Sequence, residues 1–330
     1  MIWRPELSGV SYEEAAMAGV DLASNTNLFG VNPAAARPVP DAERYPEANS
    51  PLLRAAAAAH YGVPASHVAA ASGTDQVLDL LFRALLRPGQ TVAFAEPTFS
   101  MVPIHTIQNH GKPMPVPLDA RRLAEGDVSY LARPNNPDGA VVDRAFVRDL
   151  VERARFTILD EAYIEYLGDS FSSWVLERPN LAVLRTLSKA HGLAGLRVGF
   201  GLMEPGLAAV CNAMGGPYKL SRHSETVAAQ ALQDTRFMQS SVAATKRELP
   251  IWAAALAKRG FTVAPSGANF LFARSPVQVP ALEAALRSRG YRIRTFKGPL
   301  SNHVRITVGP ADVREAFLDA LDVALGAAKA

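Results

Sequence analysis

LAVLRTLSKAHGLAGLRVGFG, residues 181–201, is where the architecture of this 330-residue chain can first be read. It opens with an apolar run, residues 181–184, that is typical of a buried strand. Two hydroxyl side chains and an amine follow the run, at Thr186, Ser188 and Lys189. Such groups are poor core material, so we expect this strand end to bind an anion and to present the lysine amine.

Short apolar runs alternate with helical stretches through the preceding part of the chain. Strands are predicted at 68–71, 91–95, 128–132, 156–159 and 181–184, with a proline-interrupted candidate at 112–117. Helices are predicted at 51–61, 76–86 and 142–154. This alternation is typical of a mostly parallel sheet with helices on both faces. We therefore predict a large three-layer α/β/α domain over residues 37–234.

The pattern changes in the last third of the chain. Long helices are predicted at 225–234 and 235–259, and Pro250 is expected to kink or restart the second. Strands at 261–264, 270–273, 291–294 and 303–308 and helices at 279–289 and 311–325 complete a smaller α+β domain, residues 235–330. Residues 1–36 form an arm too short to bury its own core, so it should lie on another part of the protein, and we group it with the small domain.

The composition is that of an ordinary soluble globular protein, with 48% hydrophobic residues, 20% charged residues and a net charge of +3. Like charges do not cluster, which gives nucleic-acid binding little support. Neither a signal peptide nor a membrane-spanning apolar run is visible. Cys211 is the only cysteine, so a reducing compartment is favoured and we expect a cytoplasmic protein. The seven histidines lack metal-ligand spacing, so no metal is expected.

Polar residues at several strand ends point to one site. Asn136, Asp160 and Lys189 each follow a predicted strand, and Thr74 and Asp75 begin a helix after another. In open α/β sheets, ligands bind outside the carboxyl ends of the strands. We therefore expect these residues to converge on a single ligand.

Each of these groups also has a purely structural interpretation. Residues 73–75 could cap a helix, residues 135–139 could be only a turn, and Asp160 could cap the segment after it. Equally, a helix N-terminus with a hydroxyl can seat a phosphate, and a buried acid needs a partner such as a protonated pyridine nitrogen. Arg197, flanked by apolar neighbours, is expected to point inward from a strand. The nucleotide signatures GxGxxG and GxxxxGK[ST] are absent from the sequence.

Longer motifs carry a family resemblance. They are RYP at 44–46, SGTDQ at 72–76, PTFSM at 97–101, PNNPDG at 134–139, DEAYIEY at 160–166, RTLSKAHGLAGLRVGFG at 185–201 and VRITVG at 304–309. In this order they resemble the fold-type I, class I/II aminotransferases that depend on pyridoxal 5′-phosphate (PLP). Within that group they are most similar to the histidinol-phosphate aminotransferases. The lysine motif and DEAY are the most specific of them, and the match covers most of the chain.

The resemblance implies a role at the cofactor for each matched residue. Lys189 would hold PLP as a Schiff base and carry a proton, and Asp160 would pair with the pyridinium nitrogen. Asn136 and Tyr163 would hydrogen-bond the ring's O3′, and Phe99 would stack on the ring. The phosphate would lie among Gly73, Thr74, Thr186, Ser188 and Arg197.

The resemblance also extends to a second subunit and to the substrate. Tyr45 would reach the phosphate bound in the partner subunit, which implies a homodimer. Arg305 resembles the arginine that binds the substrate's carboxylate or its phosphate equivalent. Arg294, Tyr12 and Asn27 match positions near the substrate headgroup.

Some positions depart from the family pattern or have no match. Residues 25–28 read Asn-Thr-Asn-Leu where the family usually has Asn-Glu-Asn-Pro, and Asp138 stands where threonine is usual. The carboxylate of Asp75 would repel phosphate, so it should cap the helix or accept a hydrogen bond. His191, two residues after Lys189, has no assigned role.

The predicted activity is that of a PLP-dependent aminotransferase. An amino group would move between an amino acid or a histidinol-phosphate-like amino-alcohol phosphate and a 2-oxo acid such as 2-oxoglutarate. One alternative is a PLP-dependent decarboxylase or lyase of the same fold, similar to threonine-phosphate decarboxylase, which would use the same cofactor residues. The other is a non-catalytic PLP-binding regulatory domain, which would normally carry a helix-turn-helix that has no room before Tyr45.

Overall fold

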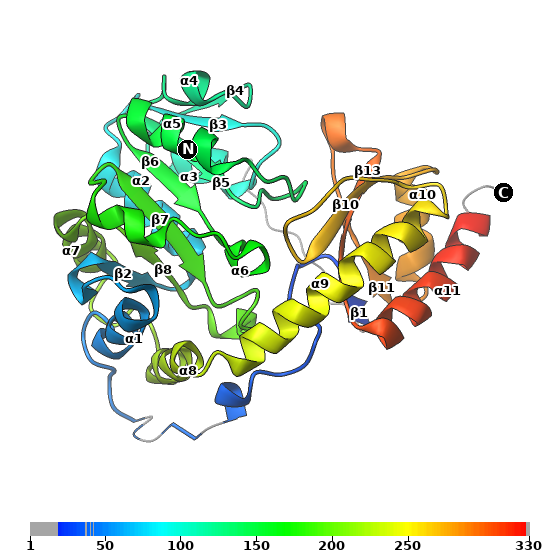
Figure 1. The fold of residues 1–330 in the computed structure, drawn as a ribbon, viewed down its shortest axis with the longest axis horizontal. Coiled ribbons are helices and arrows are strands. Elements are labelled where there is room, and N and C mark those ends of the chain that lie inside the picture. The colour runs from blue at the N-terminus through cyan, green and yellow to red at the C-terminus, as the bar shows by residue number, and fades with distance from the viewer. Residues whose placement is uncertain (1–18, 37, 40, 42, 328–330) are drawn as a thin grey trace, which may run out of the picture.

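A seven-stranded and a four-stranded sheet, with a separate pair of short strands, organise the computed structural model, which describes residues 19–36, 38–39, 41 and 43–327 (Figure 1). The large sheet has seven strands in the order β2-β8-β7-β6-β5-β3-β4. Their bounds are β2 Val68–Ala71, β3 Thr91–Ala95, β4 Lys112–Val116, β5 Val128–Ala132, β6 Thr157–Asp160, β7 Leu181–Thr186 and β8 Gly199–Leu202.

Strand direction in the large sheet brings many chain segments to one edge. Strands β7, β6, β5, β3 and β4 are parallel, and β8 runs antiparallel to both of its neighbours, β7 and β2. The carboxyl ends of β2 and of the parallel strands therefore meet the amino end of β8. The predicted mostly parallel sheet is confirmed.

Helices cover both faces of the large sheet because its strands are apolar on both sides. Along β7, Leu181 and Val183 belong to one core cluster, whereas Ala182 and Leu184 belong to the other. The first cluster includes α1 (Pro51–Tyr61), α5 (Arg144–Arg153) and α8 (Arg222–Gln233), and the second includes α2 (Gly73–Leu85), α3 (Met101–Gln108) and α7 (Pro205–Met214). Two single-turn helices, α4 (Ala120–Leu123) and α6 (Ile164–Leu167), lie in the connections. The three-layer α/β/α prediction is confirmed.

The small domain contains a smaller, antiparallel sheet with the strand order β12-β13-β10-β9. Its strands are β9 Thr262–Val263, β10 Phe270–Arg274, β12 Arg294–Thr295 and β13 His303–Thr307. Trp252 of α9 (Arg236–Ala257), Leu282 of α10 (Val279–Arg287) and Phe317 of α11 (Ala311–Ala327) pack in its core. Helix α9 leads from the large sheet to the small one in Figure 1, and we propose the domain boundary at its start.

The arm contacts both halves of the molecule. Its strand β1 (Val20–Asp21) pairs with β11 (Tyr291–Arg292), and Leu22 is buried in the core of the small domain. Farther along, Asn27 Nδ2 donates to the carbonyl of Ala190 at 3.0 Å, and Asn32 Nδ2 donates to that of His191 at 2.8 Å. The arm therefore crosses from the small domain to the lysine loop of the large one.

Two predicted elements differ from the structure, and one helix of the structure was not predicted. Helix α9 continues through Pro250 and does not restart there. The strand predicted at 291–294 is broken at Ile293 into β11 and β12, which pair with β1 and β13 respectively. Helix α7 was not predicted, although Pro205 opens it and the Glu204 carboxylate accepts hydrogen bonds from its first turn.

The two edges of the large sheet are closed by different means. Edge strand β4 contains Pro113 and Pro115, which have no N–H to offer. At β2, the Asn212 side chain donates to Val68 O at 3.0 Å and accepts from Ala70 N at 3.2 Å. Arg54 Nε also donates to Val68 O, at 3.0 Å. Within the described ranges, no helix is long and apolar enough to cross a membrane.

Candidate functional site

The turn from β2 into α2 forms a seat for an anion. Gly73 has φ +83°, and its missing side chain leaves room for the Arg197 guanidinium, which would lie 2.6 Å from a Cβ at that position. Strand β8 also passes close to the turn, since a Cβ on Gly199 would lie 2.4 Å from Thr74 N. Free N–H groups at a helix N-terminus and a guanidinium both attract phosphate.

Arg197 lies beside this seat, but its position in the backbone differs from the one predicted. It lies just before β8, in the left-handed conformation with φ 52°, and half of its side chain is exposed. The prediction that it points inward from a strand is therefore wrong. Its Nη2 lies 3.5 Å from Asp75 Oδ2, so Asp75 pairs with the arginine that borders the seat.

Lys189 follows β7 at the same edge of the sheet. Its Nζ donates to the Ser24 carbonyl of the arm at 3.0 Å and lies 5.7 Å from the centre of the Tyr163 ring. Thr186 and Ser188 are buried beside it, and Ser188 N donates to Thr186 Oγ1 at 3.1 Å. The amine, the hydroxyls and the anion seat are thus brought to one edge, as the sequence predicts.

Asp160 is the last residue of β6 and is almost fully buried. Its Oδ2 accepts from Tyr130 Oη at 2.7 Å, and its Oδ1 accepts from Ala162 N at 3.0 Å. Burial raises the pKa of Asp160, although these two hydrogen bonds and the nearby Lys189 act in the opposite direction. A cationic partner would lower that pKa again and keep the carboxylate ionised.

Tyr130 and Asn25 take part in this site but were not predicted to. Tyr130 lies in β5, whose register pairs Ala132 with Asp160, and an apolar strand gives no reason to single out its tyrosine. Asn25 is buried with φ 53°, and its Nδ2 donates to Tyr163 Oη at 3.0 Å. The available signal for Asn25 was the altered arm segment, residues 25–28.

The small domain contributes Arg305 from β13. Its Nη1 donates to Asn136 Oδ1 and its Nη2 donates to Ala23 O, the latter at 2.6 Å. Arg294 of β12 is the direct cross-strand partner of Arg305, so both side chains leave the same face of the small sheet. Two arginines on one face suit a substrate with anionic groups.

The remaining predicted residues lie in various places. Phe99 is half-buried before α3, next to the core cluster of α2. Asn27 donates its amide to Ala190 O and to Ser241 Oγ, so it fastens the arm to the lysine loop and α9. Tyr45 is 78% exposed and stacks on Tyr218, with 4.9 Å between ring centres. Tyr12 lies outside the described residues.

His191 lies in the buried layer beneath the lysine loop. Its side chain is fully buried, and neither ring nitrogen has a hydrogen-bond partner among the residues that the structure describes. Burial lowers its pKa to about 4, so the ring is neutral at neutral pH.

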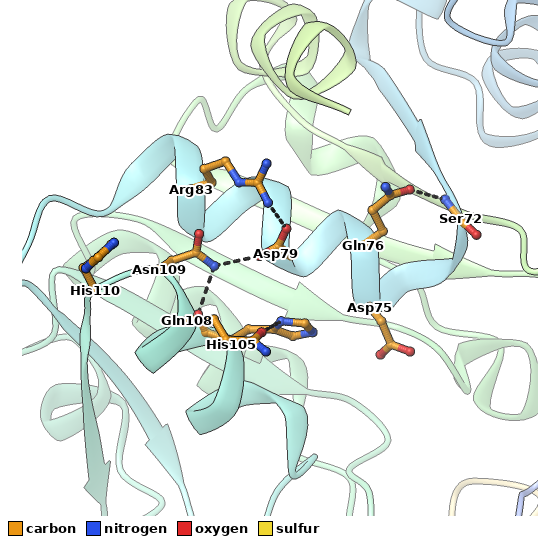
Figure 2. Close-up of a pocket in the computed structure, with 9 residues that line it drawn as sticks. All are labelled: Ser72, Asp75, Gln76, Asp79, Arg83, His105, Gln108, Asn109 and His110. Atoms are coloured by element: carbon orange, nitrogen blue, oxygen red, sulfur yellow. Dashed lines mark hydrogen bonds and ion pairs between the residues drawn. The ribbon is translucent and has the colours of Figure 1, made fainter. Parts of the chain in front are cut away.

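A polar groove borders the anion seat on its outer side, between α2 and α3 (Figure 2). Asp79 ties its two walls together, accepting from Arg83 at 2.5 Å and from Asn109 at 2.8 Å. His105 is held by Gln108 at 2.8 Å, which fits its expected structural role. Over the described part of the chain, no group of three or more His, Cys, Asp or Glu side chains could hold a metal ion.

The geometry fits PLP in three respects. Gly73 and Arg197 place a guanidinium beside a helix N-terminus, which suits the phosphate. Asp160 offers a buried carboxylate that needs a cationic partner, and a pyridinium nitrogen is one. Lys189 offers an amine at the same edge, and PLP binds covalently to such a lysine.

Comparison with known proteins identifies relatives along most of the chain. Residues 18–321 match the model of the family described as aminotransferase class I and II. Histidinol-phosphate aminotransferase 2 of Nitrosospira multiformis is 33% identical over 330 residues, covering 93% of this chain and 84% of that one. The histidinol-phosphate aminotransferase of Roseiflexus castenholzii is 34% identical over 328 residues, covering 92% and 88% respectively.

Solved structures share the fold. Histidinol-phosphate aminotransferase from Sinorhizobium meliloti, solved in complex with pyridoxal-5′-phosphate, has a TM-score of 0.86 at 24% identity and covers 98% of both chains. L-threonine-O-3-phosphate decarboxylase from Porphyromonas gingivalis has a TM-score of 0.82 at 20% identity, covering 93% of this chain and 99% of that one. At these identities the likeness extends to the fold alone.

Proposed function

The chain belongs to the class I and II aminotransferases, and from this we propose that it transfers an amino group between a histidinol-phosphate-like donor and a 2-oxo acid such as 2-oxoglutarate. It is a PLP-dependent enzyme. The observation that carries the proposal is the convergence of Lys189, Asp160 and the anion seat of Gly73 and Arg197 at one sheet edge. The names of the relatives and the paired arginines Arg294 and Arg305 support a phosphorylated donor.

Each group has a distinct task at the cofactor. Arg197, with Gly73, Thr74, Thr186 and Ser188, would hold the phosphate of PLP, and Asp160 would keep the ring nitrogen protonated. Asn136 and Tyr163 would hydrogen-bond the ring's O3′, and Phe99 would stack on the ring. When bound, PLP supplies an electron sink for the electron pair released at the substrate's Cα.

Lys189 and the arginines act on the substrate. The Lys189 amine would move the proton from the donor's Cα to C4′ of PLP, and in the reverse direction with the acceptor, so it would serve as general base and then as general acid. Arg305 binds the carboxylate or phosphate of the substrate in a bidentate manner, with Arg294 nearer the headgroup. Because Nζ of Lys189 donates to Ser24 O at 3.0 Å, the arm backbone lies against the reacting amine.

A donor panel tests the proposed activity. Purified protein loaded with PLP is given histidinol phosphate, histidine, phenylalanine or arginine, with 2-oxoglutarate as acceptor. We expect glutamate to form fastest with histidinol phosphate and not to form with Lys189→Ala. Without acceptor, wild-type protein should release one equivalent of oxo product per site, whereas carbon dioxide release from an amino acid donor would indicate a decarboxylase and reject the proposal.

We also propose a homodimer in which Tyr45 completes the partner's site. The exposed stack of Tyr45 on Tyr218 supports this, as does the hydrogen bond from Arg222 to Tyr45 O at 2.5 Å, which fixes the loop. Mixing inactive Lys189→Ala with inactive Tyr45→Ala subunits should restore activity, because the Tyr45→Ala subunit then receives an intact Tyr45. Failure of mixed dimers to gain activity would reject the shared site.

The location of the protein is proposed on its cysteine. Cys211 is free and buried, and burial raises the pKa of its thiol to about 11. A lone, unreactive thiol suits a reducing compartment, and we propose the cytoplasm.

A further inference from the structure

A buried ion triad lies directly beneath the catalytic edge. Arg185 Nη1 contacts Glu161 Oε2 at 2.9 Å, and Arg185 Nη2 contacts Glu165 Oε1 at 2.7 Å. The three side chains are only 4%, 0% and 7% exposed. None of them has a role in the proposed chemistry.

The triad joins the two segments that carry the reacting groups. Glu161 directly follows Asp160, and Arg185 lies on β7, four residues before Lys189. The backbone pairing of β6 with β7 continues to this point, where Glu161 N donates to Leu184 O at 3.1 Å. The ion pairs therefore fix the end of β6 relative to the end of β7, at the point where each strand leaves the sheet.

Further contacts leave the triad little freedom. Glu161 Oε1 accepts from Phe171 N at 2.7 Å, and its Oε2 accepts from Ser170 Oγ at 2.6 Å. The Arg185 guanidinium lies over the Tyr61 ring, 4.5 Å from its centre. Arg185 is thus held on several sides, and so is the backbone that leads to Lys189.

Stability alone does not explain this arrangement. Leu181 and Val183 lie on the same side of β7 as Arg185 and belong to an apolar core cluster. Burying three charged groups carries a large desolvation cost, and apolar side chains of similar size often stabilise such a position as well or better. A fixed geometry at the strand ends is what the ion pairs add.

We propose that Arg185, Glu161 and Glu165 are positioning residues that set the placement of Lys189 and Asp160 for proton transfer. This rests on the proposed function, because it assigns to the triad an effect on that chemistry. A displacement of about 1 Å at reacting groups can lower a rate by roughly 100-fold, so a triad variant should affect turnover well beyond its effect on folding.

The test compares triad variants with a matched ion pair elsewhere. Glu161→Gln, Glu165→Gln and Arg185→Lys are prepared as full-length, PLP-loaded protein. Glu248→Gln is the control, because its pair with Arg314 is largely buried but lies in the small domain. Each protein is measured for thermal stability, for kcat and KM, and for the pH titration of the visible band of Lys189-bound PLP.

The proposal predicts a split between these measurements. Glu161→Gln should lower kcat roughly 10- to 100-fold and shift the titration of the band, with KM little changed. Arg185→Lys keeps one ion pair, so its kcat should fall less than that of Glu161→Gln. Glu248→Gln should lower the stability and leave kcat and the titration unchanged. Triad variants with wild-type kcat and titration would overturn the proposal, even if their stability falls.

Two further outcomes are also decisive. If Glu161→Gln does not fold, Arg185→Lys and Glu165→Gln are judged by the same two measurements, kcat and the titration. Wild-type protein that takes up no PLP would instead overturn the proposed function, and the positioning role with it.

Discussion

At the scale of single residues, Gly73 combines two requirements that can be separated by experiment. Its φ of +83° favours glycine, and its missing Cβ leaves space for the Arg197 guanidinium. We expect Gly73→Ala to lower the free energy of unfolding by about 1 kcal/mol. We also expect it to weaken PLP binding about tenfold, which equals about 1.4 kcal/mol, because the methyl group displaces Arg197. Fluorescence titration of the unliganded protein with PLP measures the affinity.

Gly89 provides the matched control for this substitution. Its φ is +86°, but, apart from its two chain neighbours, no atom of the described residues lies within 4 Å of the position that a Cβ would occupy there. Gly89→Ala should therefore cost similar stability and leave PLP affinity unchanged. Equal affinities for the two variants would show that Gly73 serves only the backbone.

His191 should make stability depend on pH. Its pKa is lowered from 6.5 to about 4, first by burial and then by His60 and Arg185, with Glu165 opposing. Below pH 6.5 the unfolded chain gains a proton that the folded chain does not take up until near pH 4, so stability falls with falling pH. The loss attributable to this residue is at most about 3 kcal/mol.

His191→Leu tests that expectation. Urea unfolding at pH 7 and at pH 5 should show a smaller drop in the free energy of unfolding for the variant than for the wild type. At pH 7 the variant should be no less stable, since it removes two buried nitrogens without described partners. Parallel losses in both proteins would contradict the assigned pKa.

At the scale of elements, side chains from two neighbouring strands are hydrogen-bonded through one carboxylate. Tyr130 of β5 donates to Asp160 at the end of β6 at 2.7 Å, and this hydrogen bond opposes the rise in the Asp160 pKa caused by burial. Tyr130→Phe should therefore raise that pKa further and move the acidic limb of the activity profile to higher pH. The lost hydrogen bond should also cost about 1 kcal/mol of stability.

Tyr166→Phe is the control for Tyr130→Phe. Tyr166 is also buried, and its hydroxyl makes no hydrogen bond to the residues described. The Tyr166 variant should keep the wild-type pH profile. If both variants keep it, the Tyr130 hydroxyl does not control Asp160.

Elements differ in how well sequence predicts them. The strand that precedes Lys189 and the strand that ends at Asp160 were predictable, because fully buried strands are continuous apolar runs with polar ends. Strand direction is not encoded in such a run, so Arg197 was assigned to a strand instead of to the left-handed position before β8. The break at Ile293 also lacks a local signal, because it depends on which strands lie beside β11 and β12.

At the scale of the whole molecule, contacts between distant segments complete the site. Arg305 and Asn136 are 169 residues apart in the chain, and Asn25 and Tyr163 are 138 apart. Periodicity and turn chemistry describe short windows, so they place each residue at the end of an element but cannot pair it with another. The resemblance supplied the identity of Arg305 and the role of Asn136, whereas the contact of Asn25 required the folded structure.

The arm should respond as a unit to loss of one anchor. Asn27→Ala removes hydrogen bonds to Ala190 O and Ser241 Oγ. We expect faster amide hydrogen exchange in residues 22–28, with local stability lower by about 1–2 kcal/mol. Asn180→Ala removes two comparable bonds, to Val151 O and Ala154 O, and should leave exchange in the arm unchanged. Unaltered exchange in Asn27→Ala would mean that other contacts suffice to hold the arm.

The closed edges of the large sheet affect how the protein behaves in concentrated solution. An open strand edge is a template on which another chain can add by hydrogen bonding, and this is a common start of aggregation. Here Pro113 and Pro115 withhold donors at β4, while Asn212 and Arg54 already occupy polar groups of β2. Addition of another strand at either edge of this sheet should therefore be disfavoured.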